Sequence, residues 1–175
     1  EKGRVSRMNK ILLLLFLSIS YIASAYESGP NNYPDDFDDL IKGWNYAFGE
    51  EAKLQEGYDL LYPLAVKGES QAQLLIGSMY EEGIGFLKNY QEAYDWYEKS
   101  ANQGNGAGQL KLIKLMFRIL DEKIVVPKDR EEKNEAMGLI AERVMELYEN
   151  PRANEYQEQE AHRLWNKHKL WKYPY

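Results

Sequence analysis

Hydrophobic residues recur at helical spacing along most of the chain after residue 34. The first stripe consists of Phe37, Leu40, Ile41, Trp44 and Phe48. Positions three and four apart lie on one face of an α-helix, so this stripe predicts an amphipathic helix over residues 35–49. Asp35 or Asp36 supplies a candidate N-cap for it.

The same spacing predicts six further helices. Their expected ranges are 50–66, 70–82, 90–102, 107–121, 130–149 and 154–171. Pro63 lies inside the first of these and should kink or restart it. Short connections separate the helices, and the only weak strand candidate is Ile124–Val126.

Composition favours an all-α fold and excludes several kinds of site. The 175 residues include no Thr and only five Val, so the β-branched residues that strands prefer are scarce. With no Cys, the chain has no disulfide, cysteine zinc site or thiol nucleophile. The 22 basic and 28 acidic residues give a formal net charge of −6, which argues against nucleic-acid binding.

Residues 1–25 have the pattern of a secretory signal peptide. Basic Lys10 precedes an apolar run over residues 11–22, and the segment ends in Ala23-Ser24-Ala25. We expect cleavage after Ala25 and a periplasmic or secreted protein. The alternative is an uncleaved anchor, although the run is shorter than the roughly 20 residues that span a bilayer.

The parts around this segment have expected roles of their own. Met8 resembles a start residue, which makes residues 1–7 an N-terminal extension. Removing residues 1–25 takes away four basic residues and one acidic residue, so 18 basic and 27 acidic residues remain, a net charge of about −9. Residues 26–34 are rich in turn-forming residues and predict a flexible leader.

An internal repeat organises the middle of the chain. A shift of 36 residues places Gly68 on Gly104, and the pair Gln73-Leu74 on Gln109-Leu110. A period in this range, with two helices in each unit, is typical of solenoids.

The residues of the best repeat, 69–104, resemble the Sel1-like repeat, a relative of the tetratricopeptide repeat (TPR). The positions that agree are Ala72, Gly77, Tyr80, Gly83, Gly85, Ala93, Trp96, Tyr97, Ala101 and Gly104. Phe86, Asn89 and Ser100 depart from the usual Val, Asp and Ala. The resemblance implies an all-α fold, an α-solenoid of Sel1-like or TPR-like helix pairs with about seven helices, in which Tyr80, Tyr94, Trp96 and Tyr97 are core residues.

The resemblance is weaker outside this block. Residues 50–149 as a whole are expected to form the repeats, with a degenerate unit after residue 105. We expect residues 35–49 to form an N-terminal capping helix and residues 150–175 a C-terminal capping helix and tail, because an open stack would expose apolar faces.

The sequence offers little catalytic chemistry. His162 and His168 are six residues apart, on different sides of a helix, so no metal site is expected. Glu81 and Glu82 could imitate a catalytic carboxylate pair, but adjacent helical residues diverge by about 100°, which favours a solvated face. Residues 104–108 could hold an anion at a helix N-terminus, although they coincide with the turn between repeats. We expect no enzymatic activity and no cofactor.

Candidate partner-binding residues follow from the solenoid expectation. They are Gln73, Glu81, Glu82, Gln109, Lys114, Phe117, Arg118, Trp165 and Trp171. Under the 36-residue shift Phe117 and Arg118 replace Glu81 and Glu82, so Phe117 is either an exposed anchor or a core residue of a rotated repeat.

The end of the chain allows a similar choice. Residues 164–175 are basic and aromatic within an acidic protein. They form either a packed capping helix or a binding tail that contacts a partner or a membrane surface.

The predicted function is therefore an exported protein–protein interaction module. It would bind a partner protein or peptide on the concave face of a short solenoid, as a regulator, an adaptor or a toxin-neutralising immunity protein. The alternatives are an envelope-associated hydrolase and a structural homo-oligomer that stacks end to end. The expected state is a monomer or weak homo-oligomer that meets the membrane only through its signal peptide.

Overall fold

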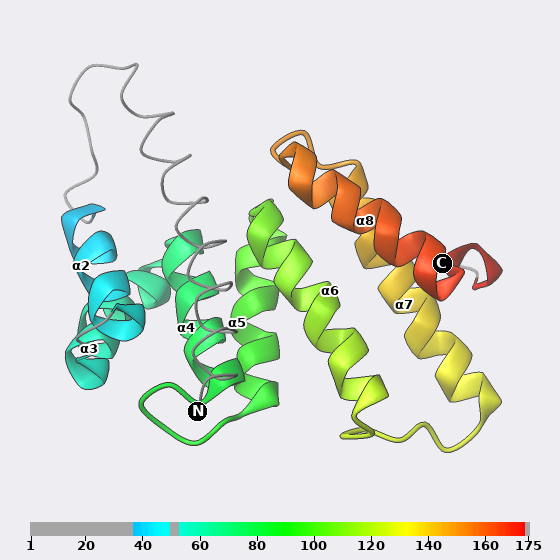
Figure 1. Ribbon diagram of the computed structural model, residues 1–175, viewed down its shortest axis with the longest axis horizontal. Coiled ribbons are helices and arrows are strands. Elements are labelled where there is room, and N and C mark those ends of the chain that lie inside the picture. The colour runs from blue at the N-terminus through cyan, green and yellow to red at the C-terminus, as the bar shows by residue number, and fades with distance from the viewer. Residues whose placement is uncertain (1–36, 50–52, 174–175) are drawn as a thin grey trace, which may run out of the picture. The chain divides into compact units, whose positions relative to one another are not determined.

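The computed structural model describes residues 37–49 and 53–173 (Figure 1). The predictions for residues 1–36, which include the signal peptide and the leader, lie outside these ranges. Contacts divide the chain into two compact units, Glu1–Asp38 and Asp39–Tyr175, and the second unit contains all of the described residues except Phe37 and Asp38.

Seven α-helices and one 3₁₀ helix account for the described residues, which contain no strand. The helices are α2 (Phe37–Phe48), α3 (Leu54–Lys67), α4 (Ser70–Glu82), α5 (Tyr90–Asn102), α6 (Gly106–Asp121), α7 (Arg130–Tyr148), α8 (Glu155–His168) and η1 (Leu170–Lys172). From α3 onward each helix packs against the next in chain order, and α4 and α6 also pack against each other. The predicted all-α solenoid fold is confirmed.

Local chemistry sets the helix boundaries. Gly68, Gly83 and Gly104 have φ values of +102°, +71° and +76°, which glycine adopts without steric cost where the chain turns after a helix. Asn89 and Asn105 begin α5 and α6, because each side chain accepts hydrogen bonds from two backbone N–H groups of the first turn.

Three sequence predictions about these elements differ from the structure. Of the kink or restart expected at Pro63, the restart does not occur: helix α3 continues through Pro63, which lies on an exposed face where water can solvate the carbonyl group that loses its backbone donor. Helix α8 ends at His168 rather than near Trp171, and Lys169 turns the chain with a φ of +53°. Ile124–Val126 form no strand and lie in the exposed connection between α6 and α7.

The core of the repeat depends on one close approach between helices. A Cβ on Gly77 of α4 would lie 2.6 Å from Cδ1 of Tyr97 on α5, so only glycine admits the ring at this position. Tyr97 is fully buried, and Trp96 beside it is 7% exposed. Tyr80 and Tyr94 are partly buried against the same core, as expected for repeat residues.

Candidate interaction site

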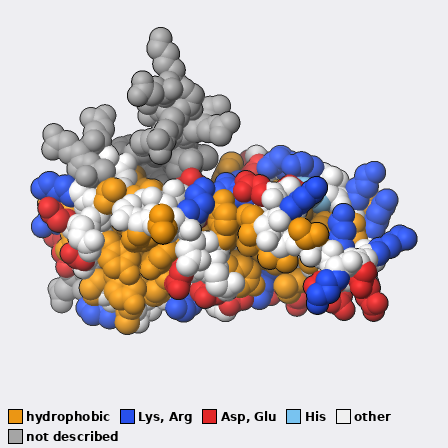
Figure 2. Space-filling model, turned by 90° about the horizontal axis from the view of Figure 1, so that it is seen from below, with side chains coloured by type: hydrophobic (Ala, Val, Ile, Leu, Met, Phe, Trp, Pro, Cys, Tyr) orange, Lys and Arg blue, Asp and Glu red, His pale blue; other side chains and the backbone are white. Residues whose placement is uncertain are grey.

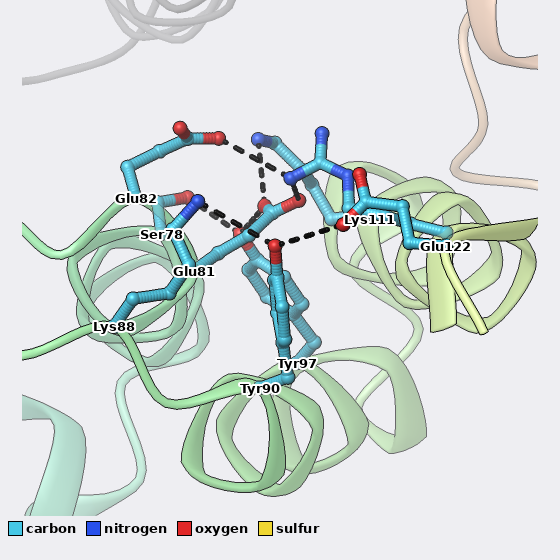
Figure 3. Close-up of polar contacts among 9 residues, drawn as sticks. Ser78, Glu81, Glu82, Lys88, Tyr90, Tyr97, Lys111 and Glu122 are labelled. Carbon is cyan, nitrogen blue, oxygen red and sulfur yellow. Dashed lines mark hydrogen bonds and ion pairs between the residues drawn. The ribbon is translucent and has the colours of Figure 1, made fainter. Parts of the chain in front are cut away.

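A buried carboxylate joins the three helices at the centre of the repeat. The Glu81 side chain is 3% exposed and accepts a hydrogen bond of 2.6 Å from the Tyr97 hydroxyl. Arg118 Nη1 lies 2.7 Å from one Glu81 oxygen, and Lys111 Nζ lies 3.4 Å from the other (Figure 3). We call Glu81, Tyr97, Lys111 and Arg118, together with Ser78, the Glu81 clasp.

The helices position this clasp by their spacing along the chain. Ser78 and Glu81 are three residues apart, so they share a face of α4, and the Ser78 hydroxyl lies 3.0 Å from the Tyr97 hydroxyl. Lys111 and Arg118 are seven residues apart on α6, about two turns, so both reach the same carboxylate. The clasp therefore connects α4 to α5 and to α6 at one point.

Burial and neighbouring charges shift the pKa values of two residues in the clasp, Tyr97 and Arg118. Burial raises the pKa of Tyr97 well above its usual value, and the neighbouring Glu81 carboxylate raises it further, so the phenol stays protonated and donates. Burial lowers the pKa of Arg118, but Glu81 and Glu82 more than offset this, and the pKa is raised overall. Two cations and one phenol thus compensate a carboxylate that would be costly to bury alone.

This arrangement suits structural cohesion better than catalysis. The Ser78, Tyr97 and Glu81 side chains form a chain of hydrogen bonds that resembles a nucleophile with a base. However, Ser78 is only 3% exposed and Tyr97 is fully buried, so a substrate has no access to either hydroxyl. Two cations also hold the Glu81 carboxylate, so its oxygens are already engaged by partners within the chain.

A second group of charges joins α6 to α8. Glu160 of α8 lies 3.0 Å from Lys114 Nζ and 2.7 Å from Arg163 Nε. The hydrogen bond from Arg163 is the main cause that lowers the pKa of Glu160 to about 2; burial opposes it, and Lys114 lowers the pKa further. Lys111, Lys114 and Arg118 therefore form one row on α6, and each contacts a carboxylate of another helix.

Two of the predicted partner-binding residues are structural amides. Gln73 is 5% exposed; its side chain donates to the Ala65 carbonyl and accepts a hydrogen bond of 2.7 Å from Gln103. The carbonyl oxygen of Gln109 accepts a hydrogen bond of 2.6 Å from Asn150. Gln73 thus links the end of α3 to the end of α5, and Gln109 links α6 to the turn after α7.

The structure decides how Phe117 and Glu81 are oriented. Phe117 is 6% exposed and its ring stacks on His168 with centroids 3.9 Å apart, so the core alternative is correct and the exposed anchor is wrong. The solvated face predicted for Glu81 is also wrong, because Glu81 is the centre of the clasp. Glu82 is exposed as predicted and lies 3.6 Å from Arg118.

The remaining candidates lie at the end of the chain. Trp165 is partly buried against the core, whereas Trp171 in η1 is 54% exposed. Leu170 between them is fully buried, so the packed alternative holds for this part of the segment and Trp171 projects from it. Over the described ranges no cluster of His, Asp and Glu has a geometry that could hold a metal ion.

The sequence did not reveal an aromatic row across α3 and α5. Tyr58 stacks on Tyr62, with ring centroids 5.0 Å apart, and Tyr62 meets Trp96 edge-on at 5.8 Å. Lys99 Nζ lies 3.9 Å from the Trp96 ring centroid, a close cation–π contact. The one sequence signal was the four-residue spacing of Tyr58 and Tyr62, which places them on one face of a helix.

The fold and the stacked helix pairs define an α-helical repeat protein of the solenoid class. Residues 70–105, which contain α4 and α5, match the model of the Sel1 repeat family. The chain therefore carries a Sel1 repeat over residues 70–105, as its motif indicated. Sel1 repeat proteins generally mediate protein–protein interactions, and their fold is typically a non-catalytic interaction module.

Similar proteins include one curated relative and two solved structures. A segment of 68 residues is 37% identical to chitin synthase regulatory factor 3 of Schizosaccharomyces pombe; it covers 37% of this chain and only 7% of that protein. A Sel1 repeat protein from Oxalobacter formigenes superposes with a TM-score of 0.52 at 24% identity, covering 83% of this chain and 98% of that one. The uropathogenic Escherichia coli protective antigen c5321, described as displaying an SLR fold, gives a TM-score of 0.47 at 25% identity, covering 76% of this chain and 30% of that one.

Proposed function

We propose that this protein is an exported interaction module that binds a partner protein or peptide on the concave face of its solenoid, the surface formed by α4 and α6. The observation that carries the proposal is the row of cations on α6. Lys111, Lys114 and Arg118 are between a quarter and two fifths exposed, and their spacing places them on one helix face. A partner with matching charges can contact this row without a change in the backbone.

The Glu81 clasp prepares this surface for binding. It fixes α6 against α4 and α5, so the cations project from a rigid framework and lose little conformational freedom when a partner arrives. Glu82 and Glu160 at the two sides of the row add negative charges, which select a partner of complementary pattern.

The physiological role we propose is that of a regulator, an adaptor or a toxin-neutralising immunity protein. The Schizosaccharomyces pombe relative is named as a regulatory factor, which supports a regulatory role for a segment of this kind. The signal-peptide pattern of residues 1–25 supports export to the periplasm or beyond. Sedimentation that shows a monomer at all concentrations would support binding to another protein over end-to-end self-assembly.

Charge reversal on the α6 row tests this proposal. The chain would be used to capture partners from an envelope extract, and Lys114→Glu should reduce the captured partner at least tenfold, since one reversed contact in an interface costs several kcal/mol. Lys133→Glu on α7 is the matched control, because Lys133 is exposed and lies outside the row. Equal capture by both variants, with their folds intact by circular dichroism, would overturn the proposal.

A further inference from the structure

The two connections that join α4 to α5 and α6 to α7 both carry exposed aliphatic side chains. Leu87 in the first connection is 90% exposed, and Ile124, Val125 and Val126 in the second are 45%, 56% and 66% exposed. Both connections lie at the lower edge of the molecule in Figure 1. Figure 2 looks at this edge and shows hydrophobic side chains with both basic and acidic side chains beside them.

Hydrogen bonds join the two connections to each other. Lys88, next to Leu87, lies 3.5 Å from the Tyr90 hydroxyl, which donates to Glu122 of the second connection at 3.4 Å. Figure 3 shows these three residues beside the clasp. We call the surface formed by Leu87, Lys88 and residues 123–128 the loop edge.

Each connection is held in place by its own backbone. In the first, Asn89 N–H donates to the Tyr80 carbonyl at 3.0 Å. In the second, Ile124 N–H donates to the Ile119 carbonyl at 3.0 Å, and Lys128 N–H donates to the Glu132 carboxylate. The ends of both connections are therefore held by hydrogen bonds, while the aliphatic side chains between them are exposed in the described part of the chain.

Cations surround these side chains. Lys88 follows Leu87, while Lys123 and Lys128 flank the aliphatic run of the second connection, and all three are exposed. Carboxylates lie beside these lysines as well: Glu122 accepts from Tyr90, Asp129 caps α7 by accepting from Glu132 N–H, the Glu132 carboxylate accepts from Lys128 N–H, and Glu131 is exposed. Asp121 is near His168, whose pKa it raises against the lowering effect of burial.

From these observations we propose that the loop edge binds an anionic lipid surface, with Leu87 and the Ile124–Val126 run inserted at the depth of the headgroups. Projecting aliphatic side chains gain free energy when they leave water for the acyl boundary, and neighbouring lysines gain from anionic headgroups. None of the described helices is long and apolar enough to cross a bilayer, so this contact would be peripheral.

The composition of the loop edge favours lipid over protein as its partner. Protein interfaces are enriched in aromatic residues, Met and Arg and depleted in Lys, and Leu and Val are under-represented among their energetic hot spots. The loop edge has the opposite composition, namely Leu, Ile, Val and three Lys. Its side chains also project from two connections, a shape that suits a flat, deformable layer.

A fluorophore at a single position tests insertion directly. The chain has no Cys, so Leu87→Cys or Val125→Cys in the full chain provides a unique labelling site for an environment-sensitive dye. With vesicles of 70% phosphatidylcholine and 30% phosphatidylglycerol, we expect a blue shift, a several-fold rise in emission, and quenching by lipid-borne spin labels. Because the dye reports its own surroundings, membrane contact by another part of the chain does not produce this signal.

Val66→Cys is the matched control for the dye. Val66 is an exposed aliphatic residue at 63%, but it lies at the end of α3 that leads into the start of α4, away from the loop edge. No change at positions 87 and 125, or an equal change at position 66, would overturn the proposal. If an added protein displaces the vesicles from the loop edge and abolishes the signal, the edge binds protein, and this result would also overturn the proposal.

The lysines are tested separately by neutralisation. The triple variant Lys88→Gln, Lys123→Asn, Lys128→Gln should raise the vesicle concentration for half-maximal signal about a hundredfold, at about fivefold for each lysine. Asn is chosen at Lys123 because that residue has a φ of +55°, which Asn tolerates. Unchanged binding of the triple variant, or equal binding to pure phosphatidylcholine vesicles, would contradict the electrostatic part of the proposal.

Discussion

The pair α4–α5 and the pair α6–α7 fill equivalent positions with opposite chemistry. Glu81 and Phe117 are 36 residues apart and both are buried, at 2% and 6% exposure. Glu81 is compensated by a phenol and two cations, whereas Phe117 stacks on His168 of α8. The repeat geometry thus fixes where a side chain points, and the neighbouring helix decides whether that position is charged or aromatic.

The space beside these positions differs in the same way. Gly77 leaves room for the ring of Tyr97, whereas the equivalent Ile113 is fully buried and fills its own space. Counted from the helix N-caps Asn89 and Asp129, Tyr97 corresponds to Met137. The first pair therefore depends on a glycine–aromatic contact and a polar clasp, and the second depends on aliphatic packing.

Removal of the Glu81 carboxylate should lower the stability of the protein more than any other change in this comparison. Glu81→Ala leaves the buried Tyr97 hydroxyl without its acceptor and two cations without their carboxylate, so the free energy of unfolding should fall by about 3–5 kcal/mol. Urea denaturation measures this loss. The adjacent Glu82→Ala should cost less than about 0.5 kcal/mol, and similar losses for the two variants would show that the burial of Glu81 is unimportant.

Truncation of the aromatic position should have a slightly smaller effect. Phe117→Ala should lower the free energy of unfolding by about 3 kcal/mol, while Phe117→Leu should cost less because most of the volume remains. His168 provides a second measurement, since burial is the main cause that lowers its pKa. NMR titration of Phe117→Ala should show the pKa of His168 raised towards its usual value, and an unchanged pKa would contradict the stacking.

A methyl group at Gly77 should cost about 2 kcal/mol. A Cβ would be 2.6 Å from the Tyr97 ring and 3.3 Å from the Ala93 carbonyl oxygen, so the ring must move. Thermal denaturation of Gly77→Ala gives the cost. In a Tyr97→Leu background the same substitution should cost clearly less, and an equal cost in both backgrounds would assign the effect to the helix backbone rather than to the ring.

The partly exposed ion pairs of Glu160 should have the smallest effect on stability, with a defined pH dependence. Because the pKa of Glu160 is lowered to about 2 in the folded chain, its contribution is complete above about pH 4.5 and is lost as the pH falls towards 2. Glu160→Gln should therefore cost about 1 kcal/mol at pH 7 and nothing near pH 2. Glu158→Gln, an exposed change on the same helix, is the control, and a pH-independent cost at Glu160 would contradict the assignment.

Much of the fold could be predicted from the sequence because its signals are local. Helical spacing and the turn residues Gly68, Gly83 and Gly104 located nearly every boundary within a few residues. The 36-residue register became weak beyond α6 for a structural reason. Helix α6 has 16 residues where α4 has 13, and the following connection is one residue longer, so the register shifts to 40.

The candidate site was harder to predict because its contacts are distant in sequence. Glu81 looked solvated beside Glu82, and its burial depends on Lys111, which is 30 residues away. Gln73 looked available to a partner, yet its side-chain oxygen already accepts a hydrogen bond from Gln103. The orientation of Phe117 was ambiguous in the sequence because the residue it stacks on, His168, lies on a different helix, α8. Periodicity locates the buried face of one helix, but it does not show which polar residues a neighbouring helix can compensate.

A double-mutant cycle on Glu81 and Arg118 tests the central claim, that the clasp couples α4 to α6, most directly. Urea denaturation would compare Glu81→Leu, Arg118→Leu, the double variant and the unchanged chain. We predict that the double variant is more stable than the sum of the single losses allows, by about 2 kcal/mol, since each single change leaves a charge without its partner. Additive losses, within about 0.3 kcal/mol, would contradict the claim.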